Sequence, residues 1–166
     1  MNNSIKFKQV IPKNLTDKQI ENPDSIWNSD FQFISGQYYQ IMAPSGSGKS
    51  TVIRSIIGSF KNYTGNIFLG STCLTNSNID ELVKVRKNKI HCVFQDLQLF
   101  DYLTISENIE LLYNSATDKE KINYLLSKFE ILNKSKTLVG KVSHGQKQRL
   151  AIIRALLGEF EWLLLD

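Results

Sequence analysis

One stretch of ten residues constrains the fold of this chain more than any other: Met42-Ala43-Pro44-Ser45-Gly46-Ser47-Gly48-Lys49-Ser50-Thr51. It lies between a short apolar run and a segment whose apolar residues recur at helical spacing. A loop that wraps a polyphosphate turns its backbone N–H groups inward, and only small or absent side chains let that backbone come close. The glycines and serines here meet that requirement. The stretch therefore predicts a phosphate-binding loop between a buried strand and an amphipathic helix.

The residues after the glycines have the chemistry that a polyphosphate needs. Lys49 supplies a point charge for the β- and γ-phosphates, and the Ser50 hydroxyl can bind the Mg²⁺ that bridges them. The usual pattern is G-x-x-x-x-G-K-[ST], and Ala43 stands at its first glycine, where a positive φ would cost about 1 kcal/mol. A surface turn before a helix is the alternative, but the order strand, loop, helix favours the phosphate loop. The predicted nucleotide contacts are Ala43, Pro44, Ser45, Gly46, Ser47, Gly48, Lys49, Ser50 and Thr51.

Composition is typical of one globular domain in a reducing compartment. The chain has 166 residues, of which 42% are hydrophobic and 22% charged. Its net charge of +4 is far from the dense basic patch of a nucleic-acid-binding protein, so no nucleic-acid partner is expected. Cys73 and Cys92 are too few for a disulfide framework. Because no stretch has the profile of a secretory signal or the length of a membrane span, any membrane must be crossed by another chain.

Hydrophobic periodicity predicts an alternation of strands and helices. Strands are expected at residues 5–10, 26–34, 38–42, 67–69 and 90–94, a turn at 62–66, a surface connection at 14–24, and helices at 49–58 and 80–87. Three further helices begin with capping boxes, in which the first and fourth side chains satisfy each other's backbone donors: Thr104-x-x-Glu107, Thr117-x-x-Glu120 and Ser143-x-x-Gln146. The first two are expected to form a helical lobe.

The last residues form a second candidate element of the site. An apolar run at residues 162–165 predicts a buried strand, and Asp166 follows it directly. A strand beside the phosphate-loop strand would bring its terminal carboxylate to the metal, which it would hold through water. An apolar run before an aspartate is common by itself, and its meaning here comes from the phosphate loop.

Four motifs, taken in order, resemble one known family. APSGSGKST, VFQD, VSHGQKQRLAIIRALL and WLLLD are similar, through nearly the whole chain, to the ATPase subunit of an ATP-binding cassette (ABC) transporter. The family's signature reads L-S-G-G-Q and continues as a helix of the type QQR-x-A-x-A-R-A-L. The matching residues here are Ser143, Gly145, Gln146, Gln148, Arg149, Arg154 and Ala155.

This resemblance implies the fold. It is an α/β fold with a P-loop NTPase core, mainly a parallel sheet with helices, an N-terminal antiparallel β lobe and an inserted helical lobe. Residues 1–166 would form one ABC-type ATP-binding domain, with the helical lobe at about residues 96–140. In the family, a glutamate that polarises the attacking water follows the residue matched by Asp166, and a histidine that senses the γ-phosphate comes later. We therefore expect a C-terminally incomplete domain, whose ability to hydrolyse ATP is open.

The resemblance also implies a mechanism shared between two chains. Two subunits meet head to tail, so that Ser143, Gly145 and Gln146 of one contact the ATP held by the phosphate loop of the other. Gln95 matches a glutamine that touches Mg²⁺ and the attacking water. The implied catalytic residues are Lys49, Gln95 and Asp166, the implied metal ligands are Ser50, Gln95 and Asp166, and the implied cofactors are ATP and Mg²⁺. A plain helix cap is the alternative role of Ser143, and the two roles are compatible.

The helical lobe of the family docks on a membrane-spanning partner. Four apolar residues are candidates for that contact, and burial in the core of the lobe is an equally favoured alternative. They are Leu97, Leu99, Phe100 and Tyr102. The stretch at residues 99–108 is also similar to exporters of the lipoprotein-release and macrolide-efflux kind, but the partner chooses the transported substrate.

Three features depart from the family pattern or carry no clear role. His144 replaces a glycine that lies near phosphate, and it either obstructs nucleotide closure or partners the phosphate when protonated. The adenine-stacking aromatic has no clear counterpart, because Trp27 and Phe31 fit better as strand residues. His91 is expected to be a core or strand residue rather than a ligand.

Three hypotheses for the function follow. The first is the ATP-hydrolysing subunit of an ABC membrane transporter, cytoplasmic and peripheral on the cytoplasmic face of the membrane, coupling ATP-driven dimer closure to transport. The alternative is a truncated or non-hydrolysing ATP-binding module. A soluble cassette ATPase acting on DNA or ribosomes is the least favoured, because the chain is weakly basic and has a single cassette.

Overall fold

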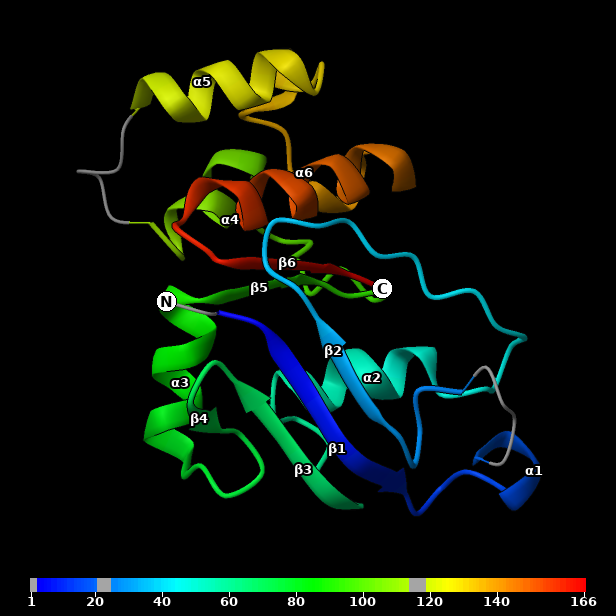
Figure 1. Cartoon of the computed structure of the whole chain (residues 1–166). Coiled ribbons are helices and arrows are strands. Elements are labelled where there is room, and N and C mark those ends of the chain that lie inside the picture. Colours follow the sequence, from blue (N-terminus) through cyan, green and yellow to red (C-terminus); the bar gives the residue numbers. More distant parts are fainter. Residues whose placement is uncertain (1–2, 21–24, 114–118) are drawn as a thin grey trace. The chain divides into compact units, whose positions relative to one another are not determined.

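A computed structural model describes residues 3–20, 25–113 and 119–166 (Figure 1). The chain divides into two compact units, one made of the residues up to Ile90 together with Asp166, and one made of residues 91–165. The α/β fold with an antiparallel N-terminal sheet and a parallel sheet is as predicted. Across the described ranges, no helix combines the length and the apolar character that a membrane crossing requires.

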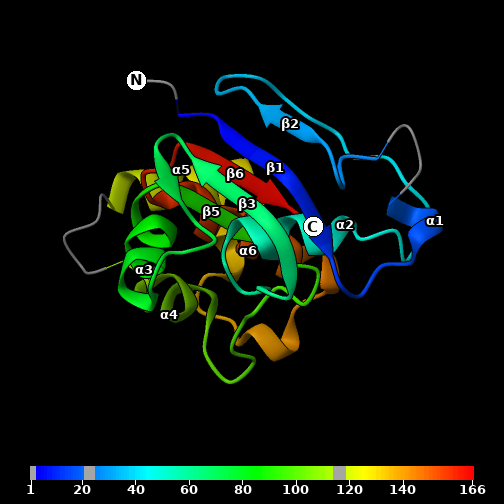
Figure 2. The same ribbon diagram turned by 60° about the horizontal axis from the view of Figure 1, so that its bottom comes forward.

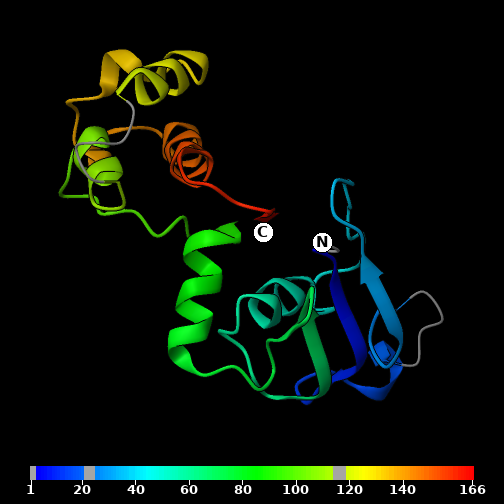
Figure 3. The same cartoon turned by 60° about the vertical axis from the view of Figure 1, so that its left-hand side comes forward.

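The first unit is built on a four-stranded antiparallel sheet in the order β2-β1-β3-β4 (Figure 1). Figure 2 shows β2, β1 and β3 from another side. The strands are β1 (Ile5–Pro12), β2 (Asp30–Phe33), β3 (Tyr63–Leu69) and β4 (Thr72–Cys73), and the helices are α1 (Asp17–Ile20), α2 (Lys49–Ile56) and α3 (Ile79–Asn88). The alternation in β1 buries Ile5 and Phe7, whose partners across the ladder include Ile67 and Leu69. Helix α2 lies beside this sheet (Figure 3) and buries Val52, Ile53 and Ile56.

The predicted turn at residues 62–66 is wrong, because residues 63–66 belong to β3. Gly65 has φ +80°, and the register between β1 and β3 shifts between Lys8 and Ile11. A Cβ on Gly65 would lie 2.2 Å from the carbonyl oxygen of Gln9, so the close approach of the two backbones requires glycine. Glycine marks a β-bulge as readily as a turn, and here it marks the bulge.

The predicted strand at residues 38–42 is also wrong. The segment is irregular and exposed, with Tyr38 at 104% and Met42 at 82% of full exposure. A buried strand needs neighbours that pair with its backbone, and no described strand pairs with this segment. Tyr39 of this segment contacts the end of β2 instead: its ring lies edge-on to Phe33, and its hydroxyl accepts a hydrogen bond at 2.7 Å from the backbone N–H of Ile34, the residue after β2. The predicted strand at residues 26–34 is shorter in the structure, where only β2 (Asp30–Phe33) is a strand.

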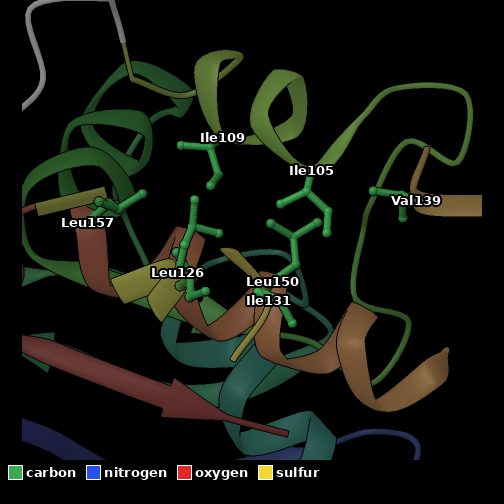
Figure 4. Packing of buried hydrophobic residues seen from close by; sticks show 8 residues of the cluster. Ile105, Ile109, Leu126, Ile131, Val139, Leu150 and Leu157 are labelled. Atoms are coloured by element: carbon green, nitrogen blue, oxygen red, sulfur yellow. The ribbon is translucent and has the colours of Figure 1, made fainter. Parts of the chain in front are cut away.

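The second unit combines a two-stranded parallel sheet with helices. The strands are β5 (Ile90–Val93), which begins at the last residue of the first unit, and β6 (Trp162–Leu165). The helices are α4 (Ile105–Glu110), α5 (Lys119–Lys128) and α6 (His144–Leu157), with 3₁₀ turns at Leu132–Lys134 and Val139–Lys141. Apolar side chains of α4, α5 and α6 point toward one another in one buried cluster (Figure 4). Its members are Ile105, Ile109, Leu126, Ile131, Val139, Leu150, Ile153 and Leu157.

Two of the three predicted capping boxes are confirmed. Thr104 and Ser143 are the N-caps of α4 and α6, and each exchanges hydrogen bonds with the residue three positions later. The backbone N–H and hydroxyl of Thr104 hold the pKa of the Glu107 carboxyl below its usual range. The third box falls partly outside the described residues, because Thr117 is not among them. His91 lies in β5, as expected, with Nδ1 2.6 Å from the carbonyl oxygen of Ala155.

Candidate functional site

The phosphate-loop stretch places two glycines in the left-handed region of backbone space. Gly46 has φ +80°, and Gly48, the N-cap of α2, has φ +93°. L side chains rarely adopt such angles, so the loop depends on glycine at both positions. Between them, the Ser47 hydroxyl donates to the carbonyl oxygen of Pro44 at 2.7 Å. The loop is thus a tight turn that leads into the positive end of a helix.

Ala43 does not carry the strain that its place in the pattern could have caused. It is not one of the described non-glycine residues with positive φ. Its methyl group is therefore compatible with the loop, and its carbonyl oxygen accepts a hydrogen bond from Lys49.

Lys49 extends from the start of α2 along this loop. Its ammonium group donates to the carbonyl oxygens of Ala43, at 2.7 Å, and Pro44, at 2.8 Å. Both partners are neutral, so they leave the charge of the ammonium uncompensated. A cation beside backbone N–H groups at a helix start is suited to an anionic ligand.

Ser50 and Asp166 meet although they are far apart in the sequence. The Ser50 hydroxyl donates to a carboxylate oxygen of Asp166 at 2.8 Å, and both residues belong to the first unit. The pair offers two hard oxygen ligands. Mg²⁺ is usually held by one or two carboxylates together with phosphate oxygens and water, so this donor set fits it. The described residues contain no cluster of three or more His, Cys, Asp or Glu side chains that could hold a metal without such help.

Residues of α1 and of the segments beside it support the loop, although the sequence did not predict them as part of the site. Gln19 donates from Nε2 to the carbonyl oxygen of Gly46 at 2.9 Å and accepts the backbone N–H of Thr16 at 2.7 Å. A Cβ on Gly48 would lie 3.1 Å from Leu15 Cδ1 and 3.3 Å from Trp27 Nε1. The pattern Thr16-x-x-Gln19 is itself a capping-box signal and could have identified the helix in this predicted surface connection.

The aromatic residues weighed for base stacking both lie in the first unit. Phe31 is in β2, as expected. Trp27 is buried in the turn that precedes this strand rather than in a strand, and its ring lies edge-on to Phe7 with centroids 6.1 Å apart.

The remaining predicted contacts belong to the second unit. Gln95 is exposed and follows β5. Ser143 accepts the Gln146 backbone N–H at 3.3 Å, and the Gln146 side chain accepts the Ser143 backbone N–H at 3.0 Å. Gly145 has open space around its Cβ position, and His144 is exposed at the first position of α6. The structure therefore brings Lys49 into contact with the phosphate loop and Ser50 into contact with Asp166, all in the first unit. The other predicted site residues belong to the second unit: Gln95, Ser143, Gly145 and Gln146.

Two roles were open for four apolar residues, a contact with another chain or a place in the core of the helical lobe, and the residues differ in burial. Leu97 and Leu99 are partly buried and pack against the two core clusters of the second unit. Phe100 and Tyr102 are 42% and 72% exposed, and their rings contact edge to face at 5.8 Å. Only the second pair is available for contact with another molecule.

Comparison with known proteins gives one consistent family. The sequence model of the family described as "ABC transporter" matches residues 26–166. The chain is 36% identical to methionine import ATP-binding protein MetN 1 of Bacillus cereus, over 98% of this chain and 47% of that protein. It is 33% identical to glycine betaine transport ATP-binding protein OpuAA of Bacillus subtilis, over 83% of this chain and 34% of that protein. The chain thus spans at most about half the length of these curated relatives.

Solved structures agree with this match. The dimeric structure of MJ0796, a bacterial ABC transporter cassette, superposes with a TM-score of 0.80 at 30% identity, over 98% of this chain and 73% of that one. A bacterial Atm1-family ABC exporter with ATP bound has the same TM-score at 24% identity, which is evidence of a shared fold.

Proposed function

The chain belongs to the ABC transporter family, and from this premise we propose that it is an ATP-binding, ATP-hydrolysing subunit that drives a membrane transporter. The proposal assigns residues 1–166 to one ATP-binding domain with its helical lobe at about residues 96–140. The observation that carries it is the hydrogen bond between Ser50 and Asp166, because it joins the two motifs that the family uses for one metal–nucleotide site.

Most of the residues that would hold the nucleotide and its metal belong to the first unit, and Gln95 belongs to the second. Backbone N–H groups of the loop from Ala43 to Thr51 would bind the phosphates, with Lys49 moving its ammonium from loop carbonyls to phosphate oxygens. Ser50, Asp166 and Gln95 would hold Mg²⁺, which when bound neutralises developing charge on the phosphates. Lys49 would stabilise the same charge, and Gln95 would orient the attacking water.

The second unit supplies what a partner chain would use. Ser143, Gly145 and Gln146 lie at the N-terminus of α6, where N–H groups and the helix dipole favour an anion. We propose that they contact the ATP of a second subunit in a head-to-tail dimer. The MJ0796 cassette is dimeric, which supports a dimer of this chain.

The transport role depends on a membrane-spanning partner. MetN 1 is an import ATP-binding protein and OpuAA a transport ATP-binding protein. We propose that this chain likewise binds a membrane subunit from the cytoplasmic face, with the exposed Phe100 and Tyr102 in the contact. The transported substrate would be chosen by that subunit.

Binding of Mg·ATP to a Lys49→Ala variant tests the proposal. We expect the parent to bind Mg·ATP and the variant to bind it at least about tenfold more weakly, because a charge-assisted hydrogen bond to phosphate is lost. Isothermal titration calorimetry measures both. The control is Lys84→Ala, which removes an exposed lysine of α3 and should bind as the parent does. Equal binding by the folded Lys49→Ala variant and the parent would refute the site.

A second measurement separates the two main hypotheses. Release of inorganic phosphate by the parent, lost in Lys49→Ala, would support the ATPase. Tight ATP binding without phosphate release would instead support the non-hydrolysing ATP-binding module.

A further inference from the structure

The segment after β5 carries Gln95 in a tight turn. The backbone N–H of Leu97 donates to the carbonyl oxygen of Phe94 at 3.0 Å, which closes a four-residue turn with Gln95 at its second position. The N–H of Gln98 donates to the carbonyl oxygen of Asp96 at 2.6 Å, which closes a second, three-residue turn. The direction of the Gln95 side chain therefore depends on the backbone angles of residues 95–98.

These turns place two consecutive non-glycine residues in the left-handed region. Leu97 has φ +55° and Gln98 has φ +46°. Such residues are strained, and they persist only where the surroundings hold them in place. Neither residue is asparagine or aspartate, which tolerate this region better. Something outside the segment must therefore stabilise this conformation.

Arg154 of α6 contacts the strained residue directly. Its Nη1 donates to the carbonyl oxygen of Gln98 at 2.8 Å. The guanidinium is half-buried, and its Nε is buried without a hydrogen-bond partner among the residues that the structure describes. A charged group that has lost part of its water is costly to leave unpaired, so the bond to Gln98 constrains both groups.

One face of α6 contacts the segment that follows β5. Leu97 packs against a small cluster that contains Ala151 and Ala155. The Lys147 ammonium lies 2.7 Å from a carboxylate oxygen of Asp101. Positions 147, 151, 154 and 155 recur at the spacing of a single helical face. The N-cap of the same helix is Ser143, so one rigid element contacts the turn of Gln95 and carries the proposed contact to the partner's nucleotide.

We propose that Arg154 is a positioning residue, which through the carbonyl of Gln98 holds the turn that aims Gln95 and fastens it to the helix capped by Ser143. This inference rests on the proposed function, in which Gln95 is a ligand of the metal. We call the hydrogen bond from Arg154 to the carbonyl of Gln98 the clamp. It can be measured without nucleotide.

Amide hydrogen exchange of the nucleotide-free full chain tests the clamp. In Arg154→Met, we expect the amides of Leu97 and Gln98 to exchange at least about tenfold faster, because loss of a charged donor frees the turn. The matched control is Arg149→Met on the same helix, since Arg149 donates to Phe129 and Glu130 instead. It should leave exchange at residues 94–98 unchanged. If Arg154→Met does not fold, Arg154→Lys replaces it, with a smaller increase expected.

A second substitution distinguishes a clamp from a general packing role. Gln98→Asn favours the left-handed region, so Arg154→Met with Gln98→Asn should return exchange of the turn to within about threefold of the parent. An unchanged turn in Arg154→Met, a uniform increase across both units, or the absence of rescue would each overturn the proposal.

A Mg²⁺ titration at fixed ATP then links the clamp to the metal. Arg154→Met should need about tenfold more Mg²⁺ for half-maximal ATP binding, as expected when a group supporting a ligand is lost. Unchanged ATP affinity without Mg²⁺ is expected in the same variant. If the parent binds no ATP, the proposed function fails while the exchange experiment still decides on the clamp.

Discussion

At the residue scale, the phosphate loop depends on backbone geometry more than on side-chain contacts. Gly46 has φ +80°, yet nothing lies within 4 Å of the Cβ position it lacks. Its requirement is therefore conformational and not steric crowding by neighbours. Gly145 has equally open surroundings but lies in the first turn of α6 with no positive φ. The two glycines form a natural comparison.

We predict different effects of the same substitution at these two glycines. Gly46→Ala should lower the free energy of unfolding by about 1 kcal/mol, because an L residue is strained at that φ. Gly145→Ala should leave it unchanged or raise it by up to about 1 kcal/mol, because alanine favours helix. Urea unfolding followed by circular dichroism measures both. Equal effects at the two positions would contradict the geometry assigned to the loop.

At the scale of elements, α6 is held in place at both ends and carries candidate site residues in its first turn. Side chains from other segments satisfy its last carbonyl groups: the Tyr113 hydroxyl donates to Arg154 at 2.7 Å and the Lys121 ammonium to Leu157 at 2.9 Å. Burial raises the pKa of the Tyr113 hydroxyl, which favours the protonated donor. At the other end, Ser143 caps the first turn. The helix is thus fixed at both ends, which suits the proposed contact of its first turn with a second chain.

Two substitutions of Ser143 separate its role as a cap from its proposed role as a phosphate contact. Ser143→Ala should lower the free energy of unfolding by about 1 kcal/mol, whereas Ser143→Asp should retain it, because aspartate caps helices as well as serine does. The carboxylate would nevertheless repel phosphate, so we expect Ser143→Asp to abolish ATP-dependent dimerisation, measured by light scattering with Mg·ATP. Parent-like dimerisation by Ser143→Asp would leave Ser143 as a helix cap only.

At the scale of the whole molecule, the candidate residues are divided between two units. Lys49, Ser50 and Asp166 belong to the first unit, and Ser143 belongs to the second. In the proposed head-to-tail dimer, each nucleotide would lie between the first unit of one chain and the second unit of the other. Each chain would thus contribute a different half of each site.

This division predicts that two inactive variants complement each other. Lys49→Ala and Ser143→Asp should each remain monomeric with Mg·ATP when alone. Their equimolar mixture retains one intact site, formed by the phosphate loop of the Ser143→Asp chain and Ser143 of the Lys49→Ala chain. We expect heterodimers that bind one ATP, detected by native mass spectrometry with differently labelled chains. A mixture that stays monomeric, while the parent dimerises, would contradict the head-to-tail arrangement.

Local chemistry could be predicted from the sequence because its causes lie within a few residues. The capping boxes at Thr104 and Ser143 need only a side chain and the N–H three positions on. The helix after Lys49 follows from apolar spacing, and the glycine-rich loop from the approach that a polyphosphate requires. The sequence by itself also determined the family, because several short motifs occur in one order.

Tertiary structure decided what depends on distant partners. The apolar run at residues 38–42 has the composition of a buried strand, but a strand exists only where another backbone pairs with it. Gly65 marks a bulge because Gln9, distant in the sequence, lies against it. The contact of Arg154 with Gln98 is likewise invisible in the sequence, since it joins residues that only folding brings within hydrogen-bond distance. The motifs predicted that Ser50 and Asp166 serve one metal site, but the direct hydrogen bond between them is seen only in the folded chain.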